Sequence, residues 1–206
     1  MPFLEYCKHF GYPAESHDIT TADGYILKVF RIQKKGSVIK SGLKPMLLQH
    51  GLLDSSDTWL INDEDKAPGF MWANAGYDIW LGNSRGNKHS RRHTTLNPDK
   101  DAAFWAFSFQ NMADFDLPAV FTYINKVTNS TIHYFGHSQG TIQMHIALSK
   151  QNPVVEKLMD KYFGLGPVAY ITHQKSGVIN LMDKSLLLEW YHLRHIHEFM
   201  PSLNWF

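Results

Sequence analysis

The chain has 206 residues, of which 44% are hydrophobic and 14% aromatic, a composition that suits one globular domain and excludes a disordered segment. Its net charge of +1 gives no global basic excess for nucleic-acid binding and no acidic excess typical of a solvating tail. The single cysteine, Cys7, excludes an internal disulfide framework, and no apolar run approaches the ~18 residues of a transmembrane helix.

The first third of the chain predicts a β-hairpin followed by a buried strand. Residues 17–34 read as two strands joined at Asp23-Gly24, because this pair readily adopts the positive φ of a tight turn. A polar, glycine-containing loop follows over 34–44. The apolar run over 45–51, PMLLQHG, then predicts a strand with both faces buried.

The rest of the chain predicts alternating strands and helices. The expected elements are strands over 76–86, 131–136 and 161–171 and helices over 111–127 and 139–151. Pro118 falls in the first turns of one helix, where a missing N–H costs least, and Asn152-Pro153 should end the other. Apolar strands separated by helices predict an α/β fold, with a mostly parallel sheet and helices on its faces.

The segment TIHYFGHSQGTIQMHIAL, residues 131–148, contains a G-x-S-x-G pattern at Gly136, Ser138 and Gly140. The pattern alone is weak, but here it lies between a predicted strand and a predicted helix, as a nucleophile elbow requires. Such a turn strains the serine, and side chains at the two glycine positions would collide with neighbouring backbone. The competing interpretation is a glycine-rich turn with an inert serine.

His50-Gly51 directly follows the first buried strand. Hydrolases with this strand–helix order take one oxyanion N–H from the loop at this place and another from the residue after the nucleophile. The expected donors are therefore the backbone N–H groups of Leu52 and Gln139, and one such donor contributes ~3–4 kcal/mol to transition-state stabilisation. Taken alone, His50-Gly51 would be an ordinary turn.

Several blocks of the chain resemble the acid lipases, the gastric and lysosomal family of α/β-hydrolases. The blocks are GYPAESHDITTADGYILKVFRI, LLQHGLLDSSDTWL, NAGYDIWLGNSRGNKHSRRHTTLNP, FWAFSFQNMADFDLPA and HYFGHSQGTIQMHIAL. The resemblance implies a serine ester hydrolase that cleaves triacylglycerols or cholesteryl esters without a cofactor. It implies that Ser138 is the nucleophile and that Leu52 and Gln139 form the oxyanion hole.

The same resemblance predicts the domain organisation. Residues 1–169 would be the N-terminal part of the hydrolase core, including a lipase-associated region over about 1–60, and residues 170–206 would begin a helical cap. The apolar segment 179–193 could be a cap helix packed on the core, a lid that opens at a lipid interface, or both. The C-terminal match, around EFMPS, is looser.

A serine hydroxyl needs a histidine base and an acid that orients it, and in this architecture both follow the elbow. The acidic residues after Ser138 are Glu156, Asp160, Asp183, Glu189 and Glu198, and the histidines are His145, His173, His192, His195 and His197. None lies in a block that resembles the family's late strand ends. We therefore expect the triad Asp and His to be absent from this chain, which would be an N-terminal half that is nearly inactive alone.

Two histidine-rich or basic patterns have simpler interpretations. The basic cluster over 85–93 is expected to be a solvated loop rather than a nucleic-acid site, because no aromatic side chains lie beside it. His192, His195 and His197 lack Cys or Asp/Glu partners at ligand spacing, so no metal site is expected.

The compartment is left open by the sequence. The first residues lack the basic and apolar regions of a signal peptide, so we expect a cytosolic protein or a missing N-terminus. The resemblance instead implies a lysosomal or secreted protein, and Asn129 begins a sequon that would be glycosylated on that route. Two rival functions remain, a non-catalytic protein that binds lipid or a partner, and a general carboxylesterase.

Overall fold

The computed structural model describes residues 1–170 and residue 175. The strands are β1 (Ala14–Thr20), β2 (Tyr25–Ile32), β3 (Pro45–Gln49), β4 (Asp78–Leu81), β5 (Arg92–His93), β6 (Ile132–His137) and β7 (Met159–Leu165). The α-helices are α1 (Phe3–His9), α2 (Pro68–Asn74), α3 (Phe109–Asn111), α4 (Leu117–Thr128), α5 (Gln139–Ser149) and α6 (Pro153–Leu158). Shorter turns are the 3-10 helices η1 (Ser56–Trp59) and η2 (Ala102–Trp105) and the π-helical turn η3 (Met112–Asp116).

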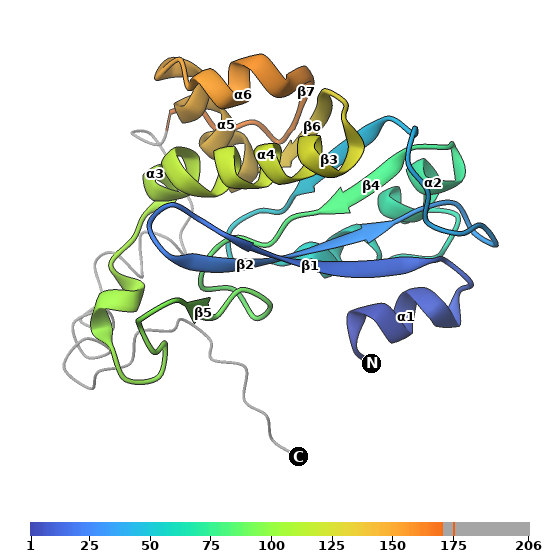
Figure 1. The fold of residues 1–206 in the computed structure, drawn as a ribbon, viewed down its shortest axis with the longest axis horizontal. Helices are drawn as coiled ribbons and strands as arrows, with labels where there is room; N and C mark the ends of the chain where they lie inside the picture. The colour runs from blue at the N-terminus through green and yellow to red at the C-terminus, as the bar shows by residue number, and fades with distance from the viewer. Residues whose placement is uncertain (171–174, 176–206) are drawn as a thin grey trace.

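The strands form one mixed sheet in the order β1-β2-β4-β3-β6-β7, and β5 pairs with β2. The four inner and C-terminal strands β4, β3, β6 and β7 run parallel, whereas β1 and β2 form an antiparallel hairpin at one side. Parallel strands need crossover connections, and helices supply them here. The expected α/β-hydrolase fold is confirmed (Figure 1).

Two hydrophobic cores cover the two faces of the sheet, because successive side chains of a strand point to opposite faces. Leu47 and Trp80 belong to the core that packs against α4 and α5. Their neighbours Met46 and Ile79 belong to the core that packs against α1 and α2. In Figure 1, α1 and α4 accordingly lie on opposite sides of the sheet. Because both faces are covered, the run over 45–48 is apolar throughout instead of alternating.

The predicted hairpin and the predicted buried strands are present. Gly24 has φ +98, and a Cβ there would lie 2.7 Å from the imidazole ring of His93, so both the turn and the packing require glycine. The expected strands over 45–51, 76–86 and 131–136 correspond to β3, β4 and β6.

The helix expected over 111–127 is not continuous. Ser108 caps α3, the chain then widens into the π turn η3, and α4 runs only from Leu117 to Thr128. Pro118 explains the change, because it has no N–H and its ring clashes with the carbonyl four residues earlier, which an ordinary α-helical turn cannot accommodate. The π turn directs Asp116 inward, where it is buried.

The strand expected over 161–171 is shifted toward the N-terminus, since β7 spans Met159–Leu165. The sequence interpretation also missed α1, α2 and α6. Asn152-Pro153 does end α5, but it starts the next helix as well. The Asn152 side chain accepts hydrogen bonds from two backbone N–H groups, and Pro153 occupies the first helical position.

The cap and lid expected from residue 170 onward lie outside the described residues, apart from Tyr170 and Lys175. None of the helices within residues 1–170 is long and apolar enough to cross a membrane.

Helix α4 offers a test of the core assignment. Ile124 is fully buried, whereas Val127 on the same helix is 37% exposed. Replacing Ile124 with Ala should lower the free energy of unfolding by ~2–5 kcal/mol, because it removes buried methyl groups and leaves a cavity. The matched Val127→Ala should change it by ~0.5 kcal/mol or less. Urea unfolding followed by tryptophan fluorescence measures both, and equal losses would contradict the packing described here.

Candidate active site

Ser138 lies at the sharp turn between β6 and α5. Its backbone angles are φ 48 and ψ −110, a region that non-glycine residues rarely adopt and that costs ~1–3 kcal/mol. Three hydrogen bonds hold the turn in place. The Ser138 N–H donates to the carbonyl of Leu165 at 3.0 Å, and the Ser138 carbonyl accepts from the N–H and the hydroxyl of Thr141 at 2.9 and 2.6 Å. The serine predicted as a nucleophile therefore sits on a strained, well-supported elbow.

The two glycines of the elbow have no room for a side chain. A Cβ at Gly136 would lie 2.9 Å from the backbone carbon of Gly140. A Cβ at Gly140 would lie 2.7 Å from the backbone oxygen of Gln49, at the end of β3. Neither contact can be relieved by turning a side chain, because backbone atoms make it. The collision expected from the G-x-S-x-G pattern is thus present at both positions.

The loop after β3 reaches the elbow because β3 and β6 are parallel neighbours. Gln49 pairs with Gly136 in the sheet register, so the two strands end side by side. A Cβ at Gly51 would lie 3.2 Å from the Cβ of Ser138, which places the loop against the serine. Beyond it, Leu52 and Leu53 are 61% and 65% exposed, and Leu53 has a positive φ of 60.

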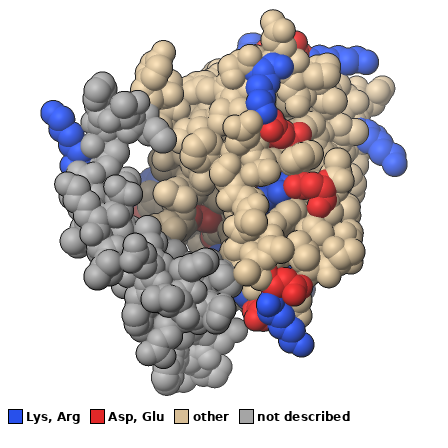
Figure 2. All heavy atoms as spheres, turned by 90° about the vertical axis from the view of Figure 1, so that its left-hand side faces the viewer, with Lys and Arg blue, Asp and Glu red and all other residues tan. Residues whose placement is uncertain are grey.

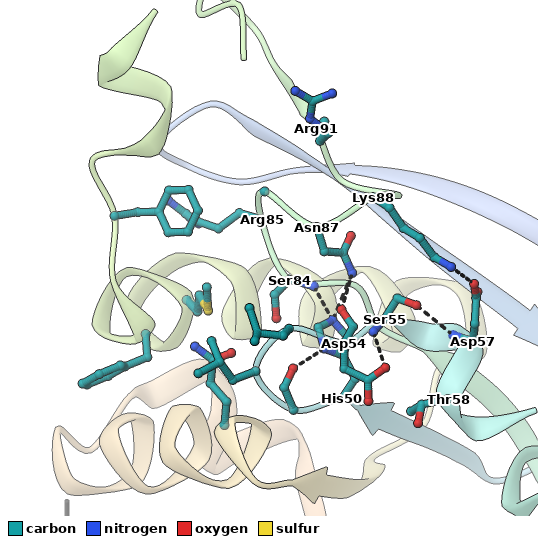
Figure 3. Close-up of a pocket in the computed structure, with 18 of the residues that line it drawn as sticks. His50, Asp54, Ser55, Asp57, Thr58, Ser84, Arg85, Asn87, Lys88 and Arg91 are labelled. Carbon is teal, nitrogen blue, oxygen red and sulfur yellow. Dashed lines mark hydrogen bonds and ion pairs between the residues drawn. The ribbon is translucent and has the colours of Figure 1, made fainter. Parts of the chain in front are cut away.

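A cleft of about 750 Å³ opens beside the elbow, and both Leu52 and Gln139 line it. Its apolar lining comes from Leu52, Leu53, Ile61, Trp105, Phe107, Phe109 and Met112. Its polar lining includes His50, Ser84, Arg85, Asn87 and Lys88, which Figure 3 shows as sticks. As the first residue of α5, Gln139 has a backbone N–H without an acceptor inside the helix. The two residues expected to form the oxyanion hole therefore share one cleft.

A buried polar network supports the loop after β3. His50 is 2% exposed, and its Nε2 accepts from the backbone N–H of Ser84 at 3.0 Å, while its Nδ1 lies 2.7 Å from the Gly51 carbonyl. The hydroxyl of Ser84 accepts from the side-chain amides of Gln49 at 2.9 Å and Gln143 at 3.3 Å. Ser84 thereby joins the ends of β3 and β4 to helix α5, under the elbow.

Arg85 forms a second buried network in the wall of the cleft. Its guanidinium donates to Asp116 at 2.9 and 2.6 Å and to Asp23 at 2.6 and 3.0 Å, and it stacks on the ring of Tyr25 with its Cζ 3.9 Å from the centroid. The network joins the hairpin turn, the loop after β4 and the π turn.

The two carboxylates of this network differ in their environment. Asp116 is enclosed by protein, and this burial raises its pKa to about 6, although the nearby Arg85 opposes the shift. Asp23 lies at the edge with its side chain 25% exposed, and hydrogen bonds from Arg85 and Thr21 lower its pKa despite partial burial. The inner carboxylate thus takes up a proton at a higher pH than the outer one.

The basic cluster over 85–93 is more ordered than the solvated loop that the sequence predicted. Arg85 is buried rather than solvated. Lys88 pairs with Asp57, Arg92 pairs with Asp18, and Arg91 contacts Asp99. Figure 2 shows acidic and basic side chains side by side on the face of the molecule that it draws.

The described residues do not supply Ser138 with a base. Within residues 1–170, no side chain makes a hydrogen bond with the Ser138 hydroxyl. Both ring nitrogens of His145 are occupied, Nδ1 by the Val168 carbonyl at 3.2 Å and Nε2 by the Tyr162 hydroxyl at 3.0 Å. Asp160 forms an ion pair with Lys44 at 2.6 Å, and Glu156 is exposed. The remaining expected candidates, Asp183, Glu189, Glu198, His173, His192, His195 and His197, lie outside the described residues.

Two further expectations concern metal binding and glycosylation. The described part of the chain holds no group of three or more His, Cys, Asp or Glu side chains arranged for a metal ion. Asn129 is exposed and ends α4 in the left-handed conformation with φ 51.

Sequence reasoning missed several residues that support the site. Ser84, Gln143, Arg85 and Asp116 act through tertiary contacts between separate elements, and no local spacing connects them, while His50 was singled out only as a marker of the loop after β3 and not for its own contacts. The one available signal was that they lie inside the blocks that resemble the acid lipases. That signal indicated a region of interest but not what each side chain does.

Comparison with known proteins agrees with this geometry. Residues 3–63 match a family described as the partial alpha/beta-hydrolase lipase region, and residues 44–193 match the alpha/beta hydrolase fold. Human lipase member M is 46% identical over 180 residues, which are 85% of this chain and 42% of that protein. Human gastric triacylglycerol lipase is 46% identical over 185 residues, 88% of this chain and 46% of that protein.

A solved esterase of Pyrococcus furiosus shares the fold. Its TM-score is 0.58 at 18% identity, over 94% of this chain and 66% of that one. The chain therefore belongs to the α/β-hydrolase family, and most of its length is similar to the N-terminal lipase region and to acid-lipase-like relatives. It spans about half the length of the curated relatives that it matches.

The elbow packing gives a test by substitution. Gly140→Ala should lower the free energy of unfolding by ~1–3 kcal/mol or more, because the new methyl group meets the Gln49 backbone oxygen at 2.7 Å. Gly164→Ala is the matched control, since its nearest neighbour, at 3.1 Å, is a side-chain atom, the hydroxyl oxygen of Tyr162, and not a backbone atom. Its expected change is ~0.5 kcal/mol. Chemical denaturation measures both changes in the free energy of unfolding. A Gly140→Ala variant as stable as the wild type would contradict the tight contact at the elbow.

Asp116 predicts a pH dependence of stability. Its folded pKa of about 6 lies above the ordinary value of 3.8, so between these values the folded chain binds more protons at this site than the unfolded chain does. Its contribution to the free energy of unfolding therefore falls as pH rises through that window and is constant above it.

The variant Asp116→Asn isolates this contribution. The stability of the wild type minus that of the variant should decrease from about pH 4 to about pH 6 and then level off. Denaturant titrations across that range provide the measurement. If this stability difference stays flat or rises with pH, the charge of Arg85 outweighs burial in setting the pKa of Asp116.

Proposed function

We propose that this chain contributes the nucleophile and the oxyanion hole of a serine ester hydrolase that acts on lipid esters. The observation that carries the proposal is the strained backbone of Ser138 between two glycines that cannot bear side chains. Such strain persists only where surrounding structure holds it, and it concentrates at functional sites. Two of the similar proteins are named lipases, which supports ester hydrolysis as the class of reaction.

The proposed reaction proceeds in two steps. The Ser138 hydroxyl oxygen attacks the ester carbonyl carbon, loses its proton to a base, and forms a tetrahedral intermediate whose oxyanion accepts hydrogen bonds from the N–H groups of Leu52 and Gln139. The base returns this proton to the departing oxygen as the ester C–O bond breaks, so the intermediate expels the neutral alcohol and leaves an acyl-serine. Water then attacks the acyl carbon and releases the carboxylic acid. The N-terminal end of α5, with its positive dipole, favours the negative charge.

We propose that the triad acid and base are not among the residues of this chain. The occupied ring of His145 and the unpaired Ser138 hydroxyl support this for residues 1–170. For the later residues, the support is the lack of any block that resembles the family's late strand ends. Losing the base costs ~10⁶-fold in rate in a comparable serine hydrolase, so turnover by this chain alone should be very slow.

The rim of the cleft supports an apolar substrate. Leu52, Leu53 and Ile61 are all more than half exposed and line the cleft together. Exposed leucines beside a cleft suit an acyl chain or a lipid interface. Triacylglycerols and cholesteryl esters are the substrates that the resemblance favours. The ion pairs of the basic cluster support the absence of nucleic-acid binding.

We also propose a lysosomal or secreted location, because the resemblance to the acid lipases favours it. The exposed, left-handed position of Asn129 at the end of α4 is accessible to a glycan and lies on a different element from the cleft. Two rival functions stay open. The lack of a base among residues 1–170 favours a non-catalytic lipid-binding or partner-binding protein, and the polar half of the cleft is compatible with a general carboxylesterase.

The test uses the 206-residue chain, with Ser138→Ala as its control. We expect turnover of a short p-nitrophenyl ester ~10⁶-fold below an ordinary serine hydrolase, and slow labelling by a fluorophosphonate at Ser138 only. No labelling would favour the non-catalytic rival. Ordinary turnover that depends on Ser138 would instead show that a base such as His195 is present. Faster labelling by long-chain than by butyl fluorophosphonates separates a lipase from a carboxylesterase.

A further inference from the structure

The imidazole of His50 lies between two loops that meet beside Ser138. Its Nε2 is 3.0 Å from the backbone nitrogen of Ser84 and 3.1 Å from the side-chain nitrogen of Asn87, and its Nδ1 is 2.7 Å from the backbone oxygen of Gly51. Figure 3 shows His50 below Ser84 and Asn87, with dashed lines reaching up to them. Every ring nitrogen therefore has a defined partner.

These partners fix the tautomer of His50. A backbone N–H can only donate, so the Nε2 that faces Ser84 must carry a lone pair and no proton. The proton of the neutral ring then resides on Nδ1, which donates to the Gly51 carbonyl. Burial lowers the pKa of His50, which favours this neutral form. Protonation at Nε2 would set two donors against each other and break the contact with Ser84.

The hydrogen bond to Gly51 also orients the next backbone N–H. The described residues contain no cis peptide bond, so the Gly51 carbonyl and the Leu52 N–H belong to one planar trans group and point in opposite directions. With the carbonyl fixed on His50, the N–H of Leu52 points away from the ring. The same peptide begins at Gly51, which lies against the Cβ of Ser138.

We propose that His50 is a positioning residue of the oxyanion hole, which holds the Gly51–Leu52 peptide so that the Leu52 N–H faces the reacting carbonyl oxygen. The inference rests on the proposed function, because it needs Ser138 to be the nucleophile. It goes further by assigning a role, a protonation state and one defined tautomer to a residue that does not touch the substrate.

The surroundings give the ring a rigid support. Ser84 is held by the side chains of Gln49 and Gln143, so the donor to Nε2 is anchored from a strand and from the elbow helix. On the other side, Leu53 keeps a positive φ of 60 in an exposed segment, a conformation that a free loop would leave. The loop is therefore held in an unfavourable conformation beside an ordered histidine.

Two matched variants separate positioning from simple packing. In His50→Asn, the new side-chain amide nitrogen takes a place near the original Nδ1 and can still donate to Gly51. In His50→Gln, the longer side chain reaches toward the original Nε2 and the bond to Gly51 is lost. Both variants keep a polar, uncharged side chain, and urea unfolding verifies that both fold.

The first measurement is two-bond ¹H–¹⁵N NMR on the wild-type chain, which should show a protonated Nδ1 and a bare Nε2 at His50. The second is the rate of Ser138 labelling by a fluorophosphonate at saturating probe. His50→Gln should lower the maximal rate by ~10²–10³-fold, the effect of losing one oxyanion donor, while half-saturation stays unchanged. His50→Asn should retain most of the wild-type rate.

Three outcomes would overturn the inference while the proposed function stands. They are a proton on Nε2, equal losses in the two variants, and a loss below ~10-fold in a folded His50→Gln. A wild-type chain that is not labelled at Ser138 at all would overturn the proposed function as well, and the inference with it.

Discussion

The site depends on one close approach, in which the backbone of Gly140 lies against the carbonyl of Gln49 at the end of β3. Only glycine permits this distance, because any Cβ would enter the van der Waals radius of the oxygen. The approach lets helix α5 start directly beside β3, which brings the elbow and the following loop into contact. The strain at Ser138, the position of Gly51 and the shared cleft of Leu52 and Gln139 all follow from it.

Around this contact the protein uses polar side chains where a core would normally use apolar ones. Gln49, His50, Ser84 and Gln143 are all buried, and each one is hydrogen-bonded. Buried polar groups are costly when unpaired, so a fully paired network defines one arrangement more sharply than hydrocarbon packing does. The network thereby fixes the loop after β3 and the loop after β4 from beneath.

The sequence predicted the elements whose signals are local. The strands over 45–51 and 131–136 and the elbow at Ser138 follow from apolar runs and glycine spacing. Sequence reasoning missed the π turn before Pro118 and the capping of α6 by Asn152. Both depend on how the chain continues after a helix is interrupted. Burial of Arg85 could not be foreseen from a run of basic residues, since its partners Asp23 and Asp116 come from distant segments.

The Arg85 network also bears on the order in which the molecule folds. Its ion pairs connect residues separated by 62 and 31 positions, so each pair forms only after the chain has closed the loop between its two partners. Loop-closure entropy is lost before such contacts stabilise anything, and long-range contacts therefore form late. The central sheet needs a longer closure still, because β3 and β6 pair Met46 with His133, 87 positions apart, so the 31-position contact between Arg85 and Asp116 can form as early as the sheet that carries the elbow. Because Arg85 and Asp116 are both buried and doubly hydrogen-bonded, this wall belongs to the parts of the molecule that resist local opening.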